Sequence, residues 1–265
     1  MTRTPETNDR AAHTNDAAPS LRTFRDPEAT AHAAASRFAE IACLSSNDSG
    51  RFSVALSGGS TPKRIYELLS EEPLRAQVPW DDVHIFFGDE RAVPPDHAES
   101  NYRMASESLL SRVPVPTENI HRIRGEGDAV ANASLYEDEL RVFFPGAQWP
   151  AFDLVMLGLG GDGHTASLFP GADVLGEREA WVAATWVEHL GAYRITLTAG
   201  AINHARNLLF VVTGKGKADA LREVIEGERD PSRLPAQLIT PTNGALEWFV
   251  DEAAASRLRA GASAQ

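Results

Sequence analysis

The feature that most constrains the fold is a short apolar run that passes directly into a glycine-rich polar loop. The run covers Leu154 to Leu157, and the loop contains four glycines together with Asp162 and His164. A run of this length is too short to span a bilayer and is typical of a buried strand. In open α/β sheets the ligand crevice lies beyond the carboxyl ends of the strands. An acid and an imidazole just past such a strand therefore predict a functional site at that edge of a sheet.

Strands and helices alternate along the rest of the chain, and there is no internal repeat. This alternation predicts an α/β fold with a mainly parallel open sheet, flanked by helices on both faces, in one Rossmann-like domain. Short apolar runs predict strands over 52–56, 83–87, 120–123, 154–157, 181–186, 193–197, 207–212 and 245–250. Apolar residues at helical spacing and N-cap residues predict helices over 27–44, 62–69, 101–111, 128–144 and 216–225, with a last helix capped by Asp251.

Composition excludes several classes of protein. Of the 265 residues, 43% are apolar and 23% charged, which is ordinary for a globular protein with a sizeable core. The formal net charge of −12, without any run of Lys or Arg, argues against nucleic acid or an anionic membrane as a partner. Positive charge for an anionic substrate must then be local. The single cysteine, Cys43, excludes an internal disulfide and fits a reducing compartment.

The two ends of the chain differ from the rest. Residues 1–20 contain almost no large apolar side chain, so we expect a disordered polar tail there, followed by one folded domain over 21–256 and a flexible tail over 257–265. The first residues lack the apolar stretch of a secretory signal, and no run of about 18 apolar residues occurs in the chain. Glu6, Asp9 and Asp16 argue against a transit peptide. The expected location is cytoplasmic.

A second glycine-rich turn follows the strand predicted at 52–56. Gly58 and Gly59 precede Ser60, Thr61 and Pro62 at the start of a helix, where free backbone N–H groups suit a phosphate. A tight turn with Thr61 as cap fits the segment equally well. Neither this turn nor residues 214–217 completes the P-loop motif of triphosphate-binding proteins.

The central loop matches G-x-G-x-x-G only formally, at Gly158, Gly160 and Gly163. Pro170 and Gly171 follow too soon for the long helix of a dinucleotide site, and no clear acid lies about 20 residues further on. NAD binding is therefore not expected.

Two cationic positions suit an anion site. Arg91 follows the strand at 83–87, where a guanidinium can clamp a phosphate bidentately, although a salt bridge with Asp89 or Glu90 is the ordinary alternative. Lys215 and Lys217 lie at the start of a predicted helix. The helix dipole disfavours cations there unless an anion is bound between them.

Four segments in order resemble the 6-phosphogluconolactonase family, within the fold group of glucosamine-6-phosphate deaminases and ribose-5-phosphate isomerases. They read VALSGGSTPKRIYELL, WDDVHIFFGDERAVPPDHAESNY, FDLVMLGLGGDGHTASLFPG and RITLTAGAINHARNLLFVVTGKGKADAL with LPAQLITPTNG, and the likeness covers about residues 24 to 256. The resemblance implies hydrolysis of 6-phospho-D-glucono-1,5-lactone, a small-molecule sugar-phosphate partner, and no metal or organic cofactor. It leaves a monomer or a weak homo-oligomer open.

Two stretches separate the chain from the deaminases of that group. In deaminases the loop histidine is followed by I-A-F-N-E-P and the second strand ends in M-D-E-Y. Here the corresponding stretches are Thr165 to Pro170, reading TASLFP, and Gly88 to Arg91, reading GDER. Both departures favour a lactonase.

Residue chemistry assigns roles that agree with the resemblance. A lactone needs a base for the attacking water, and an imidazole suits that task near neutral pH. We expect His164 to be this base and Asp162 to orient it, although a loop-stabilising Asp beside a solvent-facing His is the alternative. The expected phosphate site consists of backbone and hydroxyl donors with three cations: Gly58, Gly59, Ser60, Thr61, Arg91, Arg194 and Lys217. Arg194 fits a structural ion pair nearly as well, and Lys217 matches the family position better than Lys215.

Three other chemistries are less well supported. Asp162 and His164 lack a third metal ligand at suitable spacing, and no G-x-S-x-G elbow surrounds Ser57 or Ser167. A sugar-phosphate sensor with the same fold would need a DNA-binding unit. The residues before the first predicted helix are too few and too weakly basic for one.

Overall fold

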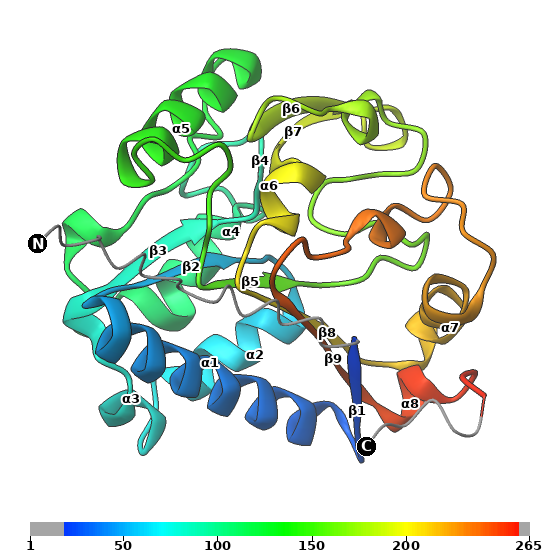
Figure 1. The fold of residues 1–265 in the computed structure, drawn as a ribbon, viewed down its shortest axis with the longest axis horizontal. Helices are drawn as coiled ribbons and strands as arrows, with labels where there is room; N and C mark the ends of the chain where they lie inside the picture. Colours follow the sequence, from blue (N-terminus) through cyan, green and yellow to red (C-terminus); the bar gives the residue numbers. More distant parts are fainter. Residues whose placement is uncertain (1–18, 260–265) are drawn as a thin grey trace, which may run out of the picture.

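Six parallel strands form the central sheet, in the order β1-β9-β8-β5-β2-β3 (Figure 1). The structure is a computed structural model and describes residues 19–259. The strands are β1 (Ser20–Phe24), β2 (Phe52–Leu56), β3 (Val83–Phe87), β5 (Leu154–Leu157), β8 (Asn207–Val212) and β9 (Ala245–Asp251). The predicted mainly parallel sheet is confirmed.

The order of the strands reverses between β2 and β5. From β2 the chain moves outward to β3 at one edge, and from β5 it moves through β8 to β9 and away from β2. The two central strands pair in parallel, with Val54 opposite Leu154 and Ala55 opposite Val155. A reversal of this kind opens a crevice at the carboxyl ends of the two strands, because the connections leave toward opposite sides.

Helices cover both sides of the sheet. Figure 1 shows α1 (Pro27–Ser49) and α2 (Ser60–Leu69) together on one side, and α5 (Ala129–Phe143) on the other. α1 begins as predicted, with Asp26 accepting a bond from the Ala29 amide, but it continues to Ser49 and ends at left-handed Gly50. The remaining helices are α3 (Leu74–Gln77), α4 (Asn101–Ala105) with a π-helical turn over Ser106–Leu110, α6 (Ala199–Asn203), α7 (Ala218–Glu226) and α8 (Glu252–Ala255). Asp251 caps α8 as predicted.

A second, smaller sheet, which the sequence did not predict, accompanies the parallel sheet. β4 (Asp89–Arg91), β6 (Val182–Val187) and β7 (Ala192–Leu197) form an antiparallel sheet in the order β4-β7-β6, on which α5 packs. The expected strands at 181–186 and 193–197 exist, but they pair with each other. β4 is entirely polar, so its strand character depends on pairing with β7 and not on an apolar pattern.

Two further expectations differ from the structure. The strand expected at 120–123 is only an isolated bridge between Ile120 and Ile85. β1 was not predicted, and it pairs with β9 from Ser20 onward. Residues 1–18 of the expected amino-terminal tail and residues 260–265 of the carboxyl-terminal tail lie outside the described residues, so the domain boundaries stay a prediction.

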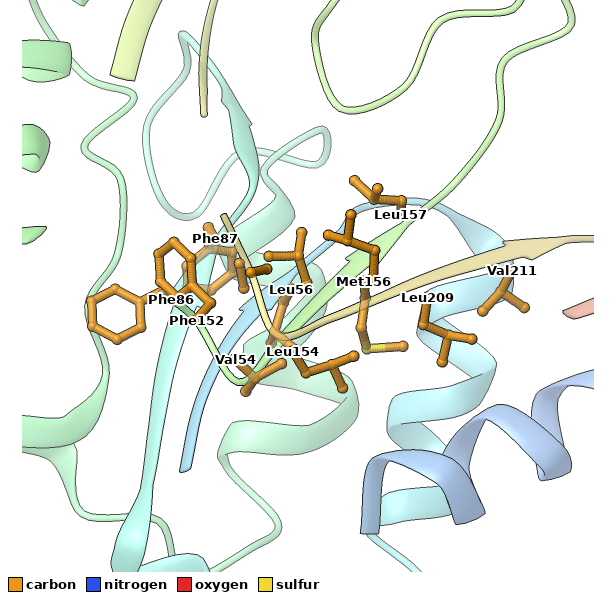
Figure 2. Packing of buried hydrophobic residues seen from close by; sticks show 14 of the residues in the cluster. Val54, Leu56, Phe86, Phe87, Phe152, Leu154, Met156, Leu157, Leu209 and Val211 are labelled. Carbon is orange, nitrogen blue, oxygen red and sulfur yellow. The ribbon is translucent and has the colours of Figure 1, made fainter. Parts of the chain in front are cut away.

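The strands around the reversal are buried on both faces. Figure 2 shows apolar side chains of β2, β3, β5 and β8 packed against each other, with Phe86, Phe87 and Phe152 gathered at one end. The rings of Phe86 and Phe152 meet edge to face, with centroids 5.4 Å apart. Such close packing makes this part of the sheet a rigid support for the loops that follow the strands.

Two buried tyrosines complete the backbone hydrogen bonds at the ends of neighbouring strands. The Tyr136 hydroxyl accepts a bond from the Phe87 amide (2.9 Å) and donates to the Phe87 carbonyl (3.2 Å). The Tyr66 hydroxyl bonds both backbone groups of Ser57 in the same way, at 3.0 and 2.9 Å. Burial raises the pKa of both phenols. At the ends of β2 and β3, one hydroxyl from a covering helix thus satisfies the peptide groups.

Replacing Tyr136 by Phe should lower the free energy of unfolding by about 1–3 kcal/mol, because it leaves the Phe87 amide and carbonyl buried without partners. Denaturant unfolding of both proteins measures the difference. Tyr193→Phe is the control, since Tyr193 is exposed and should change stability by less than about 0.5 kcal/mol. Equal stability of the Tyr136 variant and the wild type would contradict this role.

Candidate active site

A cavity of about 200 Å³ lies where the strand order reverses. Ser57 and Gly58, directly after β2, form part of its wall, and Gly158, directly after β5, forms another part. His164, Arg91 and Lys217 also line it. A larger hollow of about 490 Å³ lies beside Trp80, near the amino end of β3, and it contains no histidine. The cavity at the carboxyl ends of β2 and β5 is therefore the candidate site.

His164 and Asp162 form a hydrogen-bonded pair in the loop after β5. The Nδ1 atom of His164 lies 2.6 Å from Oδ1 of Asp162. A carboxylate only accepts hydrogen bonds, so the Nδ1 atom carries the proton and Nε2 is the basic nitrogen of the neutral ring. The ring of Phe169 packs against the imidazole, with centroids 4.3 Å apart. Asp162 thus fixes both the tautomer and the orientation of His164.

The hydrogen bond from His164 lowers the pKa of Asp162 from 3.8 to about 2. Because the pKa is lowered on folding, ionised Asp162 stabilises the folded protein at a pH above 3.8, the ordinary pKa of the group. This stabilisation is lost as the pH falls through about 2. Near neutral pH the carboxylate is therefore ionised and able to stabilise an imidazolium at His164.

Backbone bonds hold the loop in a compact form. The Gly160 amide donates to the His164 carbonyl at 2.8 Å, and the Thr165 hydroxyl donates to the Gly158 carbonyl at 2.8 Å. A Cβ atom at Gly160 would collide with Nδ1 of His164 and with Oδ1 of Asp162. Only glycine at this position leaves room for the pair.

Arg91, on β4, also lines the cavity. It is paired in register with Arg194 of the neighbouring strand β7. Nη1 of Arg91 donates to the Glu99 carbonyl, and Nη1 of Arg194 donates to the Tyr193 carbonyl. Burial, and then the charge of Arg91, lower the pKa of Arg194. Like charges on paired residues repel each other, and a bound anion would relieve that repulsion.

Lys217 approaches the cavity from the loop after β8. The Gly214 amide donates to both carboxylate oxygens of Asp251 at 3.0 Å, which fixes the start of this loop. The Thr213 hydroxyl lies 2.8 Å from the Thr61 hydroxyl at the start of α2. Within residues 19–259 no salt bridge involves Lys217. Its charge is thus available at the cavity, which Gly58 also lines.

The structure brings together only some of the predicted site residues. Gly58, Arg91, His164 and Lys217 share the cavity, and Asp162 is bonded to His164 behind it. Gly59 and Ser60 line an adjoining cleft of about 370 Å³, which shares Arg91 and Asn101 with the cavity. Thr61 and Arg194 line neither space. The Thr61 hydroxyl lies close to the Thr213 hydroxyl, and Arg194 is paired with Arg91, which lines both spaces. Their roles stay proposals.

The comparisons with known proteins agree with this geometry. Residues 25–248 match the family model described as glucosamine-6-phosphate isomerases/6-phosphogluconolactonase. A 6-phosphogluconolactonase of Synechocystis sp. is 44% identical over 215 residues, which cover 79% of this chain and 86% of that protein. The chain belongs to this family.

Two solved structures resemble this chain over most of its length. The 6-phosphogluconolactonase of Trypanosoma cruzi has a TM-score of 0.82 and 31% identity, and the match covers 94% of this chain and 100% of that one. A monomeric glucosamine-6-phosphate deaminase has a TM-score of 0.76 at 18% identity, with 90% and 99% covered, which shows a shared fold. The family resemblance inferred from the four sequence segments is thereby confirmed.

Sequence reasoning missed the roles of two buried acids, Asp89, which lines the cavity, and its neighbour Glu90. Asp89 is buried, and its carboxylate accepts bonds from the Asn101 amide group (3.2 Å) and the Ser167 hydroxyl (2.7 Å). Glu90, also buried, accepts bonds from two amides at the start of α4, those of Asn101 and Tyr102, and from the amide of its neighbour Arg91. Burial raises the pKa of Glu90. The motif GDER drew attention to its arginine only, because an acid in a charged triplet resembles a surface ion pair.

Two observations bear on a membrane and on a metal ion as possible partners. Among the helices within residues 19–259, none combines the length and apolar character needed to cross a membrane. In the same part of the chain, no three His, Cys, Asp or Glu side chains gather in a way that could hold a metal ion.

In the wild-type protein the Asp162 carboxyl should titrate near pH 2, and in His164→Ala its pKa should rise toward 3.8, because the hydrogen bond that stabilises the carboxylate is lost. NMR titration of labelled aspartate side chains measures both values. An Asp162 pKa that is the same in the two proteins would refute the assignment of this bond as the cause.

Gly160→Ala should reduce kcat by about 10²- to 10⁴-fold, because the new methyl group separates His164 from Asp162 and misplaces the base. Gly161→Ala is the matched control, since the nearest atom to its Cβ lies 3.8 Å away. Steady-state kinetics of both variants measure the effect. Full activity of the Gly160 variant would show that the pair tolerates the intrusion.

Proposed function

We propose that this site hydrolyses the ring ester of a phosphorylated sugar lactone. The chain is a lactone hydrolase that converts 6-phospho-D-glucono-1,5-lactone to 6-phospho-D-gluconate in the oxidative pentose phosphate pathway. The observation that carries the proposal is the His164–Asp162 pair at a cavity that also contains Arg91 and Lys217. The lactonase names of the relatives support it.

His164 activates the attacking water. Its Nε2 atom takes a proton from the water as the oxygen bonds to the C1 carbonyl carbon, and the carbonyl becomes a tetrahedral oxyanion. The intermediate then expels the ring oxygen, which takes the proton from His164 and becomes the 5-hydroxyl group. Asp162 stays ionised throughout and stabilises the imidazolium between the two steps. The product acid ionises and releases one proton to the solvent.

The phosphate provides binding energy and fixes the direction of the substrate. In the proposal it is held at the start of α2 by donors of Gly58, Gly59, Ser60 and Thr61, with charge from Arg91, Arg194 and Lys217. This arrangement supplies the local positive charge that a protein of net charge −12 needs for an anionic substrate. Backbone amides at a helix start also favour a phosphate, because their free N–H groups and the positive end of the helix dipole attract an anion.

The proposal also covers cofactors, partners, cellular location and oligomeric state. The reaction as written uses no metal or organic cofactor, and its only partner is the sugar-phosphate lactone. A cytoplasmic location and a monomeric or weakly self-associating chain complete the proposal, without a nucleic-acid or membrane partner. The single cysteine and the acidic composition support the location and the absence of such partners.

The assignment is tested by comparing two reactions directly. The purified protein should release acid from freshly prepared 6-phospho-D-glucono-1,5-lactone well above the spontaneous rate, and it should release no ammonium from glucosamine 6-phosphate. Ammonium release without acid release would assign the chain to the deaminase branch instead.

His164→Ala should slow turnover by about 10²- to 10⁴-fold, since the attacking water loses its base. Within the protein the substitution removes the bond to Asp162 and the packing against Phe169. Acid release under saturating lactone measures kcat. His32→Ala, an exposed position on α1, is the control and should retain wild-type kinetics. A nearly active His164 variant would remove the proposed base.

Arg91→Ala should raise KM for the phosphorylated lactone by about 10- to 100-fold, because a charge-assisted bond to the phosphate is lost. KM for the unphosphorylated lactone should hardly change. Arg124→Ala removes an exposed arginine outside the cavity and serves as the control. The same loss on both lactones would assign Arg91 to a different task.

A further inference from the structure

Phe169 packs against the imidazole of His164 but does not line the cavity. The centroids of the two rings lie 4.3 Å apart, and the ring planes are inclined by 33°. Phe169 is 7% exposed, whereas His164 borders the cavity. The aromatic ring therefore contacts the imidazole without taking up the space in which a substrate binds.

The hydrogen bond to Asp162 leaves one motion of the imidazole open. It joins Nδ1 of His164 to the Asp162 carboxylate at 2.6 Å, and so holds one edge of the ring. Both side chains are partly exposed, His164 by 30% and Asp162 by 43%. A bond at one atom does not prevent the ring plane from tilting about that bond. A flat ring packed on the face of the imidazole opposes the tilt, and with it a displacement of Nε2.

The backbone of Phe169 is itself restrained. Pro170 follows it and limits the conformations that Phe169 can adopt. The Phe169 carbonyl accepts a bond from the Ala172 amide at 3.2 Å, and the Gly171 amide donates to the Ser232 carbonyl at 3.0 Å. What remains free is the side chain, whose ring depends on its neighbours for its orientation.

His189 contacts the ring of Phe169 from the hairpin of β6 and β7. It lies on the 3₁₀ turn Glu188–Leu190, which joins these strands. The ring centroids are 5.6 Å apart at an interplanar angle of 71°, a T-shaped contact of the kind that aromatic rings prefer. Within residues 19–259, His164 and His189 are the two aromatic partners of Phe169. Phe169 thus connects the imidazole of the site to the tip of a hairpin.

The position of His189 is set by the hairpin although the side chain is exposed. The pairing of β6 with β7 extends to Val187 opposite Ala192, directly beside the turn. The Gly191 amide closes the turn with a bond to the Glu188 carbonyl at 3.1 Å. A residue held in this way can restrain the ring that it contacts.

We propose that Phe169 and His189 are positioning residues for the base. His189 restrains the ring of Phe169, and that ring restrains the tilt of His164. The inference rests on the proposed function, since it takes His164 to be the base that activates water. It adds two residues that act through the base and touch neither the substrate nor the water.

Phe169→Leu keeps an apolar side chain but removes the flat ring. It should lower kcat by about 10- to 100-fold, because small displacements of a catalytic group are costly. KM should hardly change, because the substrate keeps all its contacts. Steady-state acid release from the phosphorylated lactone measures both constants.

Phe144→Leu is the matched control. Phe144 is also 7% exposed, and it packs against Phe143 and Phe152 at centroid distances of 4.9 and 5.1 Å. It does not line the cavity. This variant should lower the unfolding temperature as Phe169→Leu does, and it should keep the wild-type kcat.

His189 is tested by a double-mutant cycle. His189→Ala should lower kcat by about 2- to 10-fold, the worth of one aromatic contact. His189→Phe should retain the wild-type kcat, because it restores a ring without the imidazole nitrogens. In the Phe169→Leu background His189→Ala should cost nothing further, because the ring through which it acts is gone.

A readout that does not depend on turnover follows the carbon-bound ring protons of His164 by NMR at a fixed high pH. Their signals are identified by their loss in His164→Ala. The ring current of Phe169 shifts these signals in the wild type, because the two rings lie close together. His189→Ala should reduce this shift toward its value in Phe169→Leu, and His189→Phe should preserve it.

Three kinetic results would overturn the inference: an unchanged kcat in Phe169→Leu, a loss confined to KM, or a cost of His189→Ala that is the same in both backgrounds. If the wild type hydrolyses no lactone, the proposed function fails, and the NMR comparison then decides the contact by itself. Signals of His164 that do not respond to His189→Ala would overturn it there as well.

Discussion

The parallel pairing of β2 with β5 is the constraint on which the rest of the structure depends. It places Val54 against Leu154 in the buried centre of the sheet, and the chain leaves the two strands toward opposite edges. The segments after both strands must therefore border the same space. The loop with His164 and the turn with Gly58 meet at that space although about a hundred residues separate them. Apolar packing beneath the two strands keeps this meeting point rigid.

The charged side chains of the site come from different elements of the fold. The basic nitrogen of His164 and the carboxylate of Asp162 come from one loop, whereas Arg91 comes from the small antiparallel sheet and Lys217 from the loop after β8. An acidic protein thereby gathers positive charge at one cavity, which the Asp89 carboxylate also lines. This separation gives a polar substrate one orientation, because its anionic end and its hydroxyl groups favour different sides.

Much of this arrangement could be predicted from local sequence, and the remainder depends on contacts between distant segments. An apolar run followed by D-G-H predicted β5 and the functional loop, because both signals lie within one short stretch. β1 was missed since SLRTF carries only two large apolar residues, and its pairing with β9 decides its structure. β4 was missed because Asp, Glu and Arg have no apolar pattern. The bonds between the Tyr66 hydroxyl and the Ser57 backbone could not be predicted either, because Tyr66 comes from another element.

The central claim is that one cavity at the carboxyl ends of β2 and β5 holds the whole sugar phosphate in a single direction. A crystal structure of the protein with 6-phosphogluconate bound tests it most directly. The account predicts the carboxyl carbon of the product next to Nε2 of His164 and the phosphate at the start of α2, near Arg91 and Lys217. A phosphate next to His164, or a product bound away from this cavity, for example in the hollow beside Trp80, would contradict it.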